Sequence, residues 1–351
     1  MDIKTNNIGK TFSGVNVLRN VDFDLKPGEV HALVGENGAG KSTFVKILSG
    51  VYTPTEGDIF LDDKKVNITS PIVAQKNGVS LIHQEPQSFS HLSVAENIFM
   101  GHMEGNNFSR VKWKDINKKS NEILESIGLK IDPKKIMEGL SIADQQMIEI
   151  AGALSKNSRV LIMDEPTSPL TPNEVGKLFD IVNKLKSNGM AIIFISHRLE
   201  EIRQISDRVT IFRDGDLITT KNINEVSNEE IIKFMIGRNI EETEVKENQF
   251  IKNDEYILNV KNLSLSKKFN EISFNLKKGE ILGFAGLVGA GRTEVAKSIF
   301  GAEKFDKGEI IYNGESIINN SPNEAINNGF AYVPEDRKQM GIFGPVAVED
   351  N

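Results

Sequence analysis

The chain is 351 residues long, has a net charge of −7 and contains no cysteine. This length predicts two domains, each with its own core, and the acidic balance argues against a general affinity for nucleic acid. The lack of cysteine excludes disulfide bridges and thiolate metal sites, which suits the cytosol. Residues 1–6 lack the apolar core of a signal peptide, and no apolar run of about 20 residues occurs, so we expect a soluble chain.

The first 30 residues alternate apolar and polar side chains and lead to a Lys26-Pro27-Gly28 turn, a pattern typical of antiparallel strands. A short apolar run from Val30 to Val34, with His31 inside it, predicts the next strand. Phe12 lies ahead of this strand, where its ring is a candidate to stack on a purine base. On the sequence alone, a place for Phe12 in the hydrophobic core is favoured over that role.

A glycine-rich segment follows the strand and fits the pattern G-x-x-x-x-G-K-[ST] of a phosphate-binding P-loop. Its candidate nucleotide-binding residues are Gly35, Glu36, Asn37, Gly38, Ala39, Gly40, Lys41, Ser42 and Thr43. The glycines let backbone N–H groups turn toward an anion, and a helix predicted over 43–48 adds its positive end. Lys41 is expected to neutralise the β- and γ-phosphates, and the Ser42 hydroxyl to ligate Mg²⁺. The alternative is a strand-to-helix turn with a chance Lys-Ser pair.

Two further strands are predicted after the P-loop helix, one from Asp58 to Leu61 and one that begins at Gly78. The second ends at a polar pair and a proline, Gln84-Glu85-Pro86. Between about residues 88 and 155 the pattern becomes helical, with many surface Lys and Glu residues. We interpret this region as a small helical subdomain inserted between the elements of the sheet.

Polar residues follow the remaining predicted strands. Ser141 has the signal of a helix N-cap ahead of a helix predicted over 147–154. Two near-continuous apolar strands come next, over 160–163 and 191–195, as in a parallel sheet that helices cover on both faces. Ligands of such sheets bind at the carboxyl ends of the strands. Those ends carry the P-loop, Gln84, Asp164-Glu165 and Ser196-His197. We therefore expect these groups to converge on one site.

Nucleotide hydrolysis needs a held metal, an activated water and a group that senses the γ-phosphate. We expect Asp164 to hold Mg²⁺ and Glu165 to act as the base that polarises water. Gln84 is a candidate ligand of Mg²⁺ or water, and His197 a candidate hydrogen-bond partner of the γ-phosphate. The alternative for Asp164-Glu165 is an acidic strand end that caps the next helix. The alternative for His197 is a surface or core histidine without a role in the site.

The ordered set of P-loop, Gln84, Leu140-Ser141, Asp164-Glu165 and Ser196-His197 resembles the ATPase domain of ABC transporters over residues 1 to about 240. Leu140-Ser141-Ile142-Ala143-Asp144, where other branches have Leu-Ser-Gly-Gly-Gln, is similar to the carbohydrate importers of the ribose, galactose and autoinducer-sugar type. The resemblance implies an α/β P-loop NTPase fold with a mixed sheet, an N-terminal antiparallel β subdomain and an inserted helical subdomain.

The same resemblance implies ATP and Mg²⁺ as cofactors, and ATP bound between the P-loop of one domain and the signature serine, here Ser141, of the other. Its implied partners are transmembrane permease subunits and, indirectly, an extracytoplasmic sugar-binding protein, with no nucleic acid. The location implied is peripheral, on the cytoplasmic face of the plasma membrane. The sequence does not name the sugar.

A register of matching residues repeats with an offset of 251, which carries Gly35 to Gly286, Gly40 to Gly291 and Pro71 to Pro322. Such a repeat predicts two copies of one fold, at 1–240 and 256–351, joined by an acidic linker over 241–255. In the second copy Arg292 replaces Lys41, which is not a conservative exchange at a phosphate site.

By this register the second copy is partial, and we expect the chain to be truncated at its C-terminus. The Lys41 site would then lack the signature serine that faces it, and Ser141 would face the Arg292 site. Residues 255–351 are expected to fold poorly, because their strands would keep open edges.

Two alternatives remain open at this level. One is a soluble tandem ATPase that acts on ribosomes, which the acidic linker and Arg292 disfavour. The other is a regulatory module that binds nucleotide without turnover.

Overall fold

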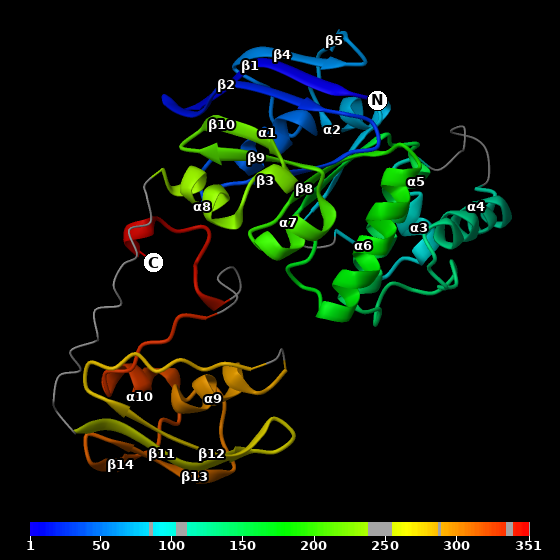
Figure 1. Ribbon diagram of the computed structural model, residues 1–351. Coiled ribbons are helices and arrows are strands. Elements are labelled where there is room, and N and C mark those ends of the chain that lie inside the picture. The colour runs from blue at the N-terminus through cyan, green and yellow to red at the C-terminus, as the bar shows by residue number, and fades with distance from the viewer. Residues whose placement is uncertain (84–86, 103–110, 238–254, 287–288, 335–339, 351) are drawn as a thin grey trace. The chain divides into compact units, whose positions relative to one another are not determined.

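A computed structural model describes residues 1–83, 87–102, 111–237, 255–286, 289–334 and 340–350. The chain divides into two compact units, Met1–Glu241 and Glu242–Asn351, and each is described here by itself (Figure 1). The predicted domain boundaries stay a prediction, and most of the expected linker, residues 241–255, lies outside the described residues. No described helix is long and apolar enough to cross a membrane.

Unit 1 is built on a curled mixed sheet of ten strands in the order β5-β4-β1-β2-β10-β9-β3-β8-β7-β6. The strands β1, β2, β4 and β5 pair antiparallel, as the alternating sequence predicts. The strands β9, β3, β8, β7 and β6 pair parallel. The strands are β1 (Ile3–Phe12), β2 (Val15–Leu25), β3 (Val30–Val34), β4 (Glu56–Leu61), β5 (Lys64–Val66), β6 (Val79–Ile82), β7 (Val160–Asp164), β8 (Ala191–Ile195), β9 (Arg208–Arg213) and β10 (Asp216–Asn222).

Helices cover both faces of the parallel strands. The helices of unit 1 are α1 (Lys41–Leu48), α2 (Pro71–Lys76), α3 (Val94–Ile98), α4 (Trp113–Ser126), α5 (Ile142–Ser155), α6 (Pro172–Ser187), α7 (Leu199–Ile205) and α8 (Asn228–Ile236), with a 3-10 turn η1 (Ile223–Glu225). On β7, Leu161 and Met163 pack with α3–α6, whereas Ile162 packs with α1 on the other face. This alternation follows from the two-residue period of a strand, and it confirms the doubly covered sheet.

The helical subdomain consists of α3, α4 and α5, which lie together at one side of unit 1 (Figure 1). Helix α5 begins at Ile142, five residues before the predicted Met147, because Ser141 caps it directly. The Ser141 side chain accepts a hydrogen bond from the Asp144 N–H at 3.1 Å. The N-cap signal of the sequence is therefore confirmed, and the predicted start of the apolar pattern was too late.

Unit 2 has a four-stranded antiparallel sheet in the order β12-β11-β13-β14, with two helices beside it (Figure 1). Its elements are β11 (Tyr256–Leu265), β12 (Phe269–Lys277), α9 (Arg292–Ile299), β13 (Lys307–Tyr312), β14 (Glu315–Ile317), α10 (Pro322–Asn327) and a 3-10 turn η2 (Val348–Asp350). A small core around Leu258, Val260, Leu263 and Ile310 holds the sheet together. The four strands have the order of β2-β1-β4-β5 in unit 1.

Candidate nucleotide site

Two glycines of the P-loop occupy positions that no other residue fits. Gly35 has φ of 155°, and a Cβ there would lie 2.4 Å from the Phe212 carbonyl oxygen. Gly40 has φ of 103°, and a Cβ there would lie 2.6 Å from Leu18 Cδ2. Positive φ and close backbone approach both require glycine. The loop is thereby pressed against β2 and β9 on one side.

Lys41, the first residue of α1, turns back over the loop that precedes it. Its Nζ donates hydrogen bonds to the carbonyl oxygens of Gly35 at 2.7 Å and Glu36 at 3.0 Å. Burial lowers the pKa of Lys41, while the charges of Glu165 and Asp164 act in the opposite direction. A partly buried ammonium group held by neutral carbonyls is well suited to exchange them for an anionic phosphate.

The two acidic residues stand where the sequence predicts, at the carboxyl end of β7. Burial raises the pKa of the Asp164 carboxyl, and the adjacent Glu165 charge raises it further, whereas Lys46, Lys41 and His83 oppose the rise. Glu165 has φ of 48°, and its N–H donates to the Ile195 carbonyl oxygen at 3.0 Å. A left-handed backbone conformation is strained in a residue that is not glycine. It turns the chain sharply after β7 and ties Glu165 to the end of β8.

His197 lies beside Glu165 as expected. Its Nδ1 is 3.4 Å from Glu165 Oε1, and its side chain is 63% exposed while that of Glu165 is 24% exposed. An imidazole that is open to solvent and next to a carboxylate is free to meet a ligand. Of the two alternatives, a core histidine is therefore wrong, and the γ-phosphate role of this exposed histidine stays a prediction.

A carboxylate that the sequence analysis did not single out joins the two loops. Glu201 Oε2 accepts hydrogen bonds from the Thr167 hydroxyl at 2.7 Å and the Ser196 hydroxyl at 2.8 Å. Its Oε1 accepts from Arg198 at 3.1 Å. Glu201 is buried, and so are both hydroxyls. The loop after β7, with Glu165, and the loop after β8, with His197, are thus anchored to one side chain.

Some predicted site residues are not brought to this centre. Gln84 lies outside the described residues. Ser141 is exposed at the start of α5, and in the described parts of the chain no hydrogen bond joins it to the P-loop. Phe12 is 37% exposed, so it is not a core residue; its ring packs edge-on against Tyr52 at 5.1 Å, with Lys10 Nζ 4.9 Å from its centroid.

The sequence analysis also missed Lys46 and Tyr52. Lys46 lowers the pKa of Asp164, and Tyr52 contacts the ring of Phe12. Lys46 lies on the same helix as Lys41, so the sequence could have indicated it as a second positive charge near the site. Tyr52 follows the helix in a turn, and only the fold brings it to Phe12.

The residues present fit a nucleotide and a magnesium ion. The carboxyl group of Asp164 is destabilised as an anion by burial and by its neighbour, and a divalent cation would remove that cost. Ser42 is exposed at the start of α1, which makes its hydroxyl available as a second oxygen ligand. The described residues contain no cluster of three or more His, Asp or Glu side chains that could hold a metal ion.

Comparison with known proteins agrees with this geometry. The model of the family described as ABC transporter matches residues 18–168 and 269–350. The chain belongs to the ABC transporter family.

Relatives of this ABC transporter chain carry names of one kind. The chain is 44% identical over 344 residues to the "Ribose import ATP-binding protein RbsA 2" of Streptomyces avermitilis, and the match covers 98% of the chain and 68% of that protein. It is 47% identical over 351 residues to the "Galactose/methyl galactoside import ATP-binding protein MglA" of Fusobacterium nucleatum, with coverage of 99% and 70%.

Solved structures give the same fold for this member of the ABC transporter family. A nucleotide-free ATP-binding cassette from an ABC transporter superposes with a TM-score of 0.59 at 25% identity, covering 68% of the chain and 96% of that structure. The ADP conformation of another ATP-binding cassette gives a TM-score of 0.60 at 26% identity, with coverage of 68% and 100%.

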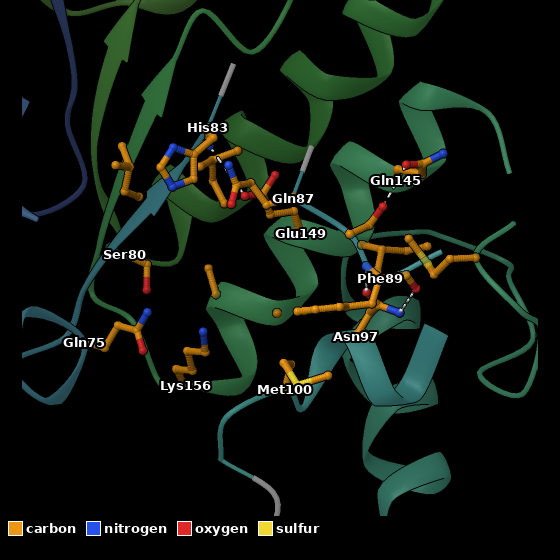
Figure 2. Close-up of a pocket in the computed structure, with 17 residues that line it drawn as sticks. Gln75, Ser80, His83, Gln87, Phe89, Asn97, Met100, Gln145, Glu149 and Lys156 are labelled. Carbon is orange, nitrogen blue, oxygen red and sulfur yellow. Dashed lines mark hydrogen bonds between the residues drawn. The ribbon is translucent and has the colours of Figure 1, made fainter. Parts of the chain in front are cut away.

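A cavity of about 290 Å³ opens next to the end of β6, between that strand and the helices α3 and α5 (Figure 2). Its walls include His83 and Gln87, which flank the segment that contains Gln84. Glu149 lines it from α5, and Lys156 lines it from the position directly after α5. The cavity therefore connects the nucleotide end of the sheet with the helical subdomain.

Proposed function

We propose that this chain binds and hydrolyses ATP as the motor subunit of a bacterial sugar importer of the ribose and galactose type. The observation that carries the proposal is the arrangement of Lys41, Asp164 and Glu165 around one glycine loop, where the two acidic charges act on the pKa of Lys41. The importer names of its relatives support sugar as the transported substrate.

Within this proposal each residue has one task. Lys41 and the N–H groups of the P-loop hold the phosphates, and Ser42, Asp164 and Gln84 supply oxygen ligands for Mg²⁺, which neutralises phosphate charge when bound. Glu165 takes the proton of the attacking water, and His197 donates to the γ-phosphate. Phe12 gives the adenine ring an aromatic surface, and Ser141 serves the site of the opposing domain.

We further propose that unit 2 is a second, altered copy of the same domain. The offset of 251 residues relates α1 to α9, β4 to β13, β5 to β14 and α2 to α10 without a shift at either end of any pair. The family match to residues 269–350 supports the same interpretation. Arg292 stands at the position of Lys41, so hydrolysis is assigned to the site with Lys41.

The partners follow from the importer class. The chain would sit on the cytoplasmic side of a transmembrane permease, and an extracytoplasmic protein would capture the sugar. The cavity beside β6 is the place where closure on ATP would reach the permease, because it joins the flanks of Gln84 to the helical subdomain.

The test is ATP turnover by the chain, measured over a range of protein concentrations, for the wild type and for Glu165→Gln. We expect turnover to rise more steeply than protein concentration, because the site is completed by an opposing domain, and Glu165→Gln to bind ATP with almost no turnover. Glu200→Gln, an exposed neighbour on α7, is the matched control. Unchanged turnover in Glu165→Gln would refute the base assignment.

A further inference from the structure

Unit 1 has a further cavity at the opposite end of the parallel strands from the candidate nucleotide site. Its volume is about 450 Å³, and it is bounded by the hairpin of β4 and β5, the end of α2 and the connection from α5 to β7. These segments meet where β6 and β7 begin, since Val79 pairs with Val160 there. Asp164 lies at the other end of β7. The cavity is therefore separate from the nucleotide site.

Most of the charged residues around this cavity are cationic. The ionisable residues that line it are Asp62, Lys64, Lys76, Lys156 and Arg159, and the space between them is called the basic cavity. Arg159 forms an ion pair with Asp62 at 3.1 Å. Within the described part of the chain, the side chains of the three lysines form no ion pair and no hydrogen bond. The basic cavity therefore has more cations than partners for them.

The local charge stays positive when the nearby helix ends are counted. Helix α2 ends at Lys76, and α5 ends directly before Lys156, so two helix C-termini lie at the wall of the cavity. Each C-terminus is equivalent to about half a negative charge, and a lysine beside it is an ordinary way to offset that charge. Together with Asp62, the helix ends balance about two of the four cations. Roughly two positive charges are left without compensation.

Lys156 is half-buried, whereas the other three cations are exposed. Burial lowers the pKa of its ammonium group, and the charge of Glu149 offsets this only in part. Lys156 and Gln75 also line the cavity beside β6, where both lie at the same end (Figure 2). An anion in the basic cavity would stabilise this ammonium group, because it would supply the close acceptor that the group lacks.

The size and polarity of the basic cavity suit a small anionic molecule. A volume of about 450 Å³ is within the range of small-molecule sites. The side chains of Gln75 and Asn157 also line it, and neither forms a hydrogen bond with another described residue. A phosphate monoester carries a charge of about −1.5 to −2 at pH 7 and has three strong acceptor oxygens. Its charge matches the positive charge that is left over.

We propose that the basic cavity binds a phosphate monoester. Lys64, Lys76 and Lys156 donate to its terminal oxygens, and the amides of Gln75 and Asn157 serve the molecule that carries the phosphate. That molecule is a small phosphorylated metabolite or phosphatidic acid, which present the same group. The proposal goes beyond ATP hydrolysis and does not rest on it.

The test is the binding of ribose 5-phosphate to the whole chain, measured by isothermal titration calorimetry, with ribose as the uncharged control. Mg²⁺ and a non-hydrolysable ATP analogue are present in excess, so that the site of Lys41 is occupied. Ribose 5-phosphate should bind and ribose should not. Lys64→Gln, Lys76→Gln and Lys156→Gln should each weaken binding by about three- to tenfold, since each removes one charged hydrogen bond.

Phosphatidic acid is tested by co-sedimentation with vesicles of phosphatidylcholine that contain it or lack it. Two variants serve as matched controls in both assays. Lys134→Gln removes an exposed lysine outside the cavity, and Arg292→Ala removes the guanidinium group at the start of α9. Neither should change the affinity. Retained binding of a fluorescent ATP analogue would verify the fold of each variant.

Binding of ribose 5-phosphate that depends on the three lysines would assign the basic cavity to a soluble phosphate monoester. Binding to the phosphatidic acid vesicles alone, with the same dependence, would assign it to a lipid headgroup. The proposal is overturned if neither probe binds, or if the lysine variants bind as well as Lys134→Gln does. None of these measurements depends on ATP turnover, so this proposal and the proposed function can fail separately.

Discussion

The strand that leads into the P-loop and its counterpart in unit 2 have similar sequences and different structures. All five residues of β3 are buried, and β8 and β9 pair with it on both sides. The counterpart by the offset of 251 residues, Ile281–Ala285, forms no strand, and Ile281 is 98% exposed while Phe284 is 48% exposed. Among the described residues of unit 2 no strand flanks it. The helices that follow, α1 and α9, nevertheless have the same length and the same left-handed glycine before them.

This difference shows that the helix can form from hydrogen bonds within its own segment, whereas the strand depends on neighbouring strands. An eight-residue helix with a glycine N-cap contains its own hydrogen bonds, whereas a parallel strand receives all of them from its neighbours. The expectation that residues 255–351 fold poorly is wrong for the hairpin sheet and the helices, whose partners are close in sequence. The open segment at 281–285 is the part to which the reasoning about unpaired edges applies.

The largest expected effect separates the two units by chemistry. In the importer assembled with its permease, Glu165→Gln should lower ATP turnover by about 100- to 10,000-fold, since it removes the proposed base from the site with Lys41. Arg292→Ala in unit 2 should change turnover by less than about threefold. Steady-state phosphate release measures both, and equal losses would mean that unit 2 also hydrolyses ATP.

The second largest difference between the two units should come from core packing. Phe44 of α1 is fully buried against Phe23 and Phe212, with ring centroids 5.3 and 5.5 Å away. Phe44→Ala should therefore destabilise unit 1 by about 3–5 kcal/mol. Phe284→Ala should cost under about 1 kcal/mol, because that ring is half exposed. Urea denaturation followed through Trp113, the sole tryptophan, reports unit 1, and hydrogen exchange in α9 reports unit 2. A large loss for Phe284→Ala would show that 281–285 is packed in solution.

The contribution of Glu149 to the stability of unit 1 should fall as the pH rises from about 5 to 7.5. Its carboxyl has a pKa of about 7 in the fold and an ordinary value when unfolded, so in this window it binds more protons in the folded state than in the unfolded state. The loss is at most about 3 kcal/mol for 2.5 units of pKa. Burial lowers the pKa of His31, His83 and His102, which act in the opposite direction, so the test is the difference between the wild-type and Glu149→Gln profiles. That difference should change over this window, and Glu122→Gln should leave the wild-type profile unchanged. A difference that stays constant with pH would contradict the burial of this carboxyl.

Nucleotide affinity should differ less between variants of unit 1 and unit 2 than ATP turnover does. Lys41→Ala should weaken ATP binding at the first site by about ten- to a hundredfold, which is the value of a charged hydrogen bond to phosphate. Arg292→Ala should weaken it by less than about twofold at that site. Titration with a fluorescent ATP analogue measures both. A second binding phase that only Arg292→Ala removes would assign a nucleotide to unit 2 as well.

The smallest effects should be equal in the two units. Ser70 caps α2 by accepting from the Val73 N–H at 3.4 Å, and Ser321 caps α10 by accepting from the Glu324 N–H at 3.3 Å. Alanine at either position should cost about 1 kcal/mol of local stability. Hydrogen exchange in the first turn of each helix tests this, and a loss in one helix alone would mean that its cap depends on distant contacts.

Much of this site was predictable, because its signals are local in the chain. The P-loop glycines, the end of β7 at Asp164 and the cap at Ser141 each depend on a few neighbouring residues, and the structure has all three elements, although α1 and α5 begin earlier than predicted. Glu201 was not predictable, since its two hydroxyl partners lie 34 and 5 residues away and meet only when β7 and β8 pair. The raised pKa of Glu149 was not predictable either, because it follows from burial of the carboxyl in the folded chain.

Glu201 ties two loops of the candidate site to one side chain. This single buried carboxylate accepts from the loop behind Glu165 and from the loop that carries His197, so a shift of either loop alone would break a hydrogen bond to Glu201. We therefore expect Glu165, the proposed base, and His197, the proposed phosphate sensor, to shift together.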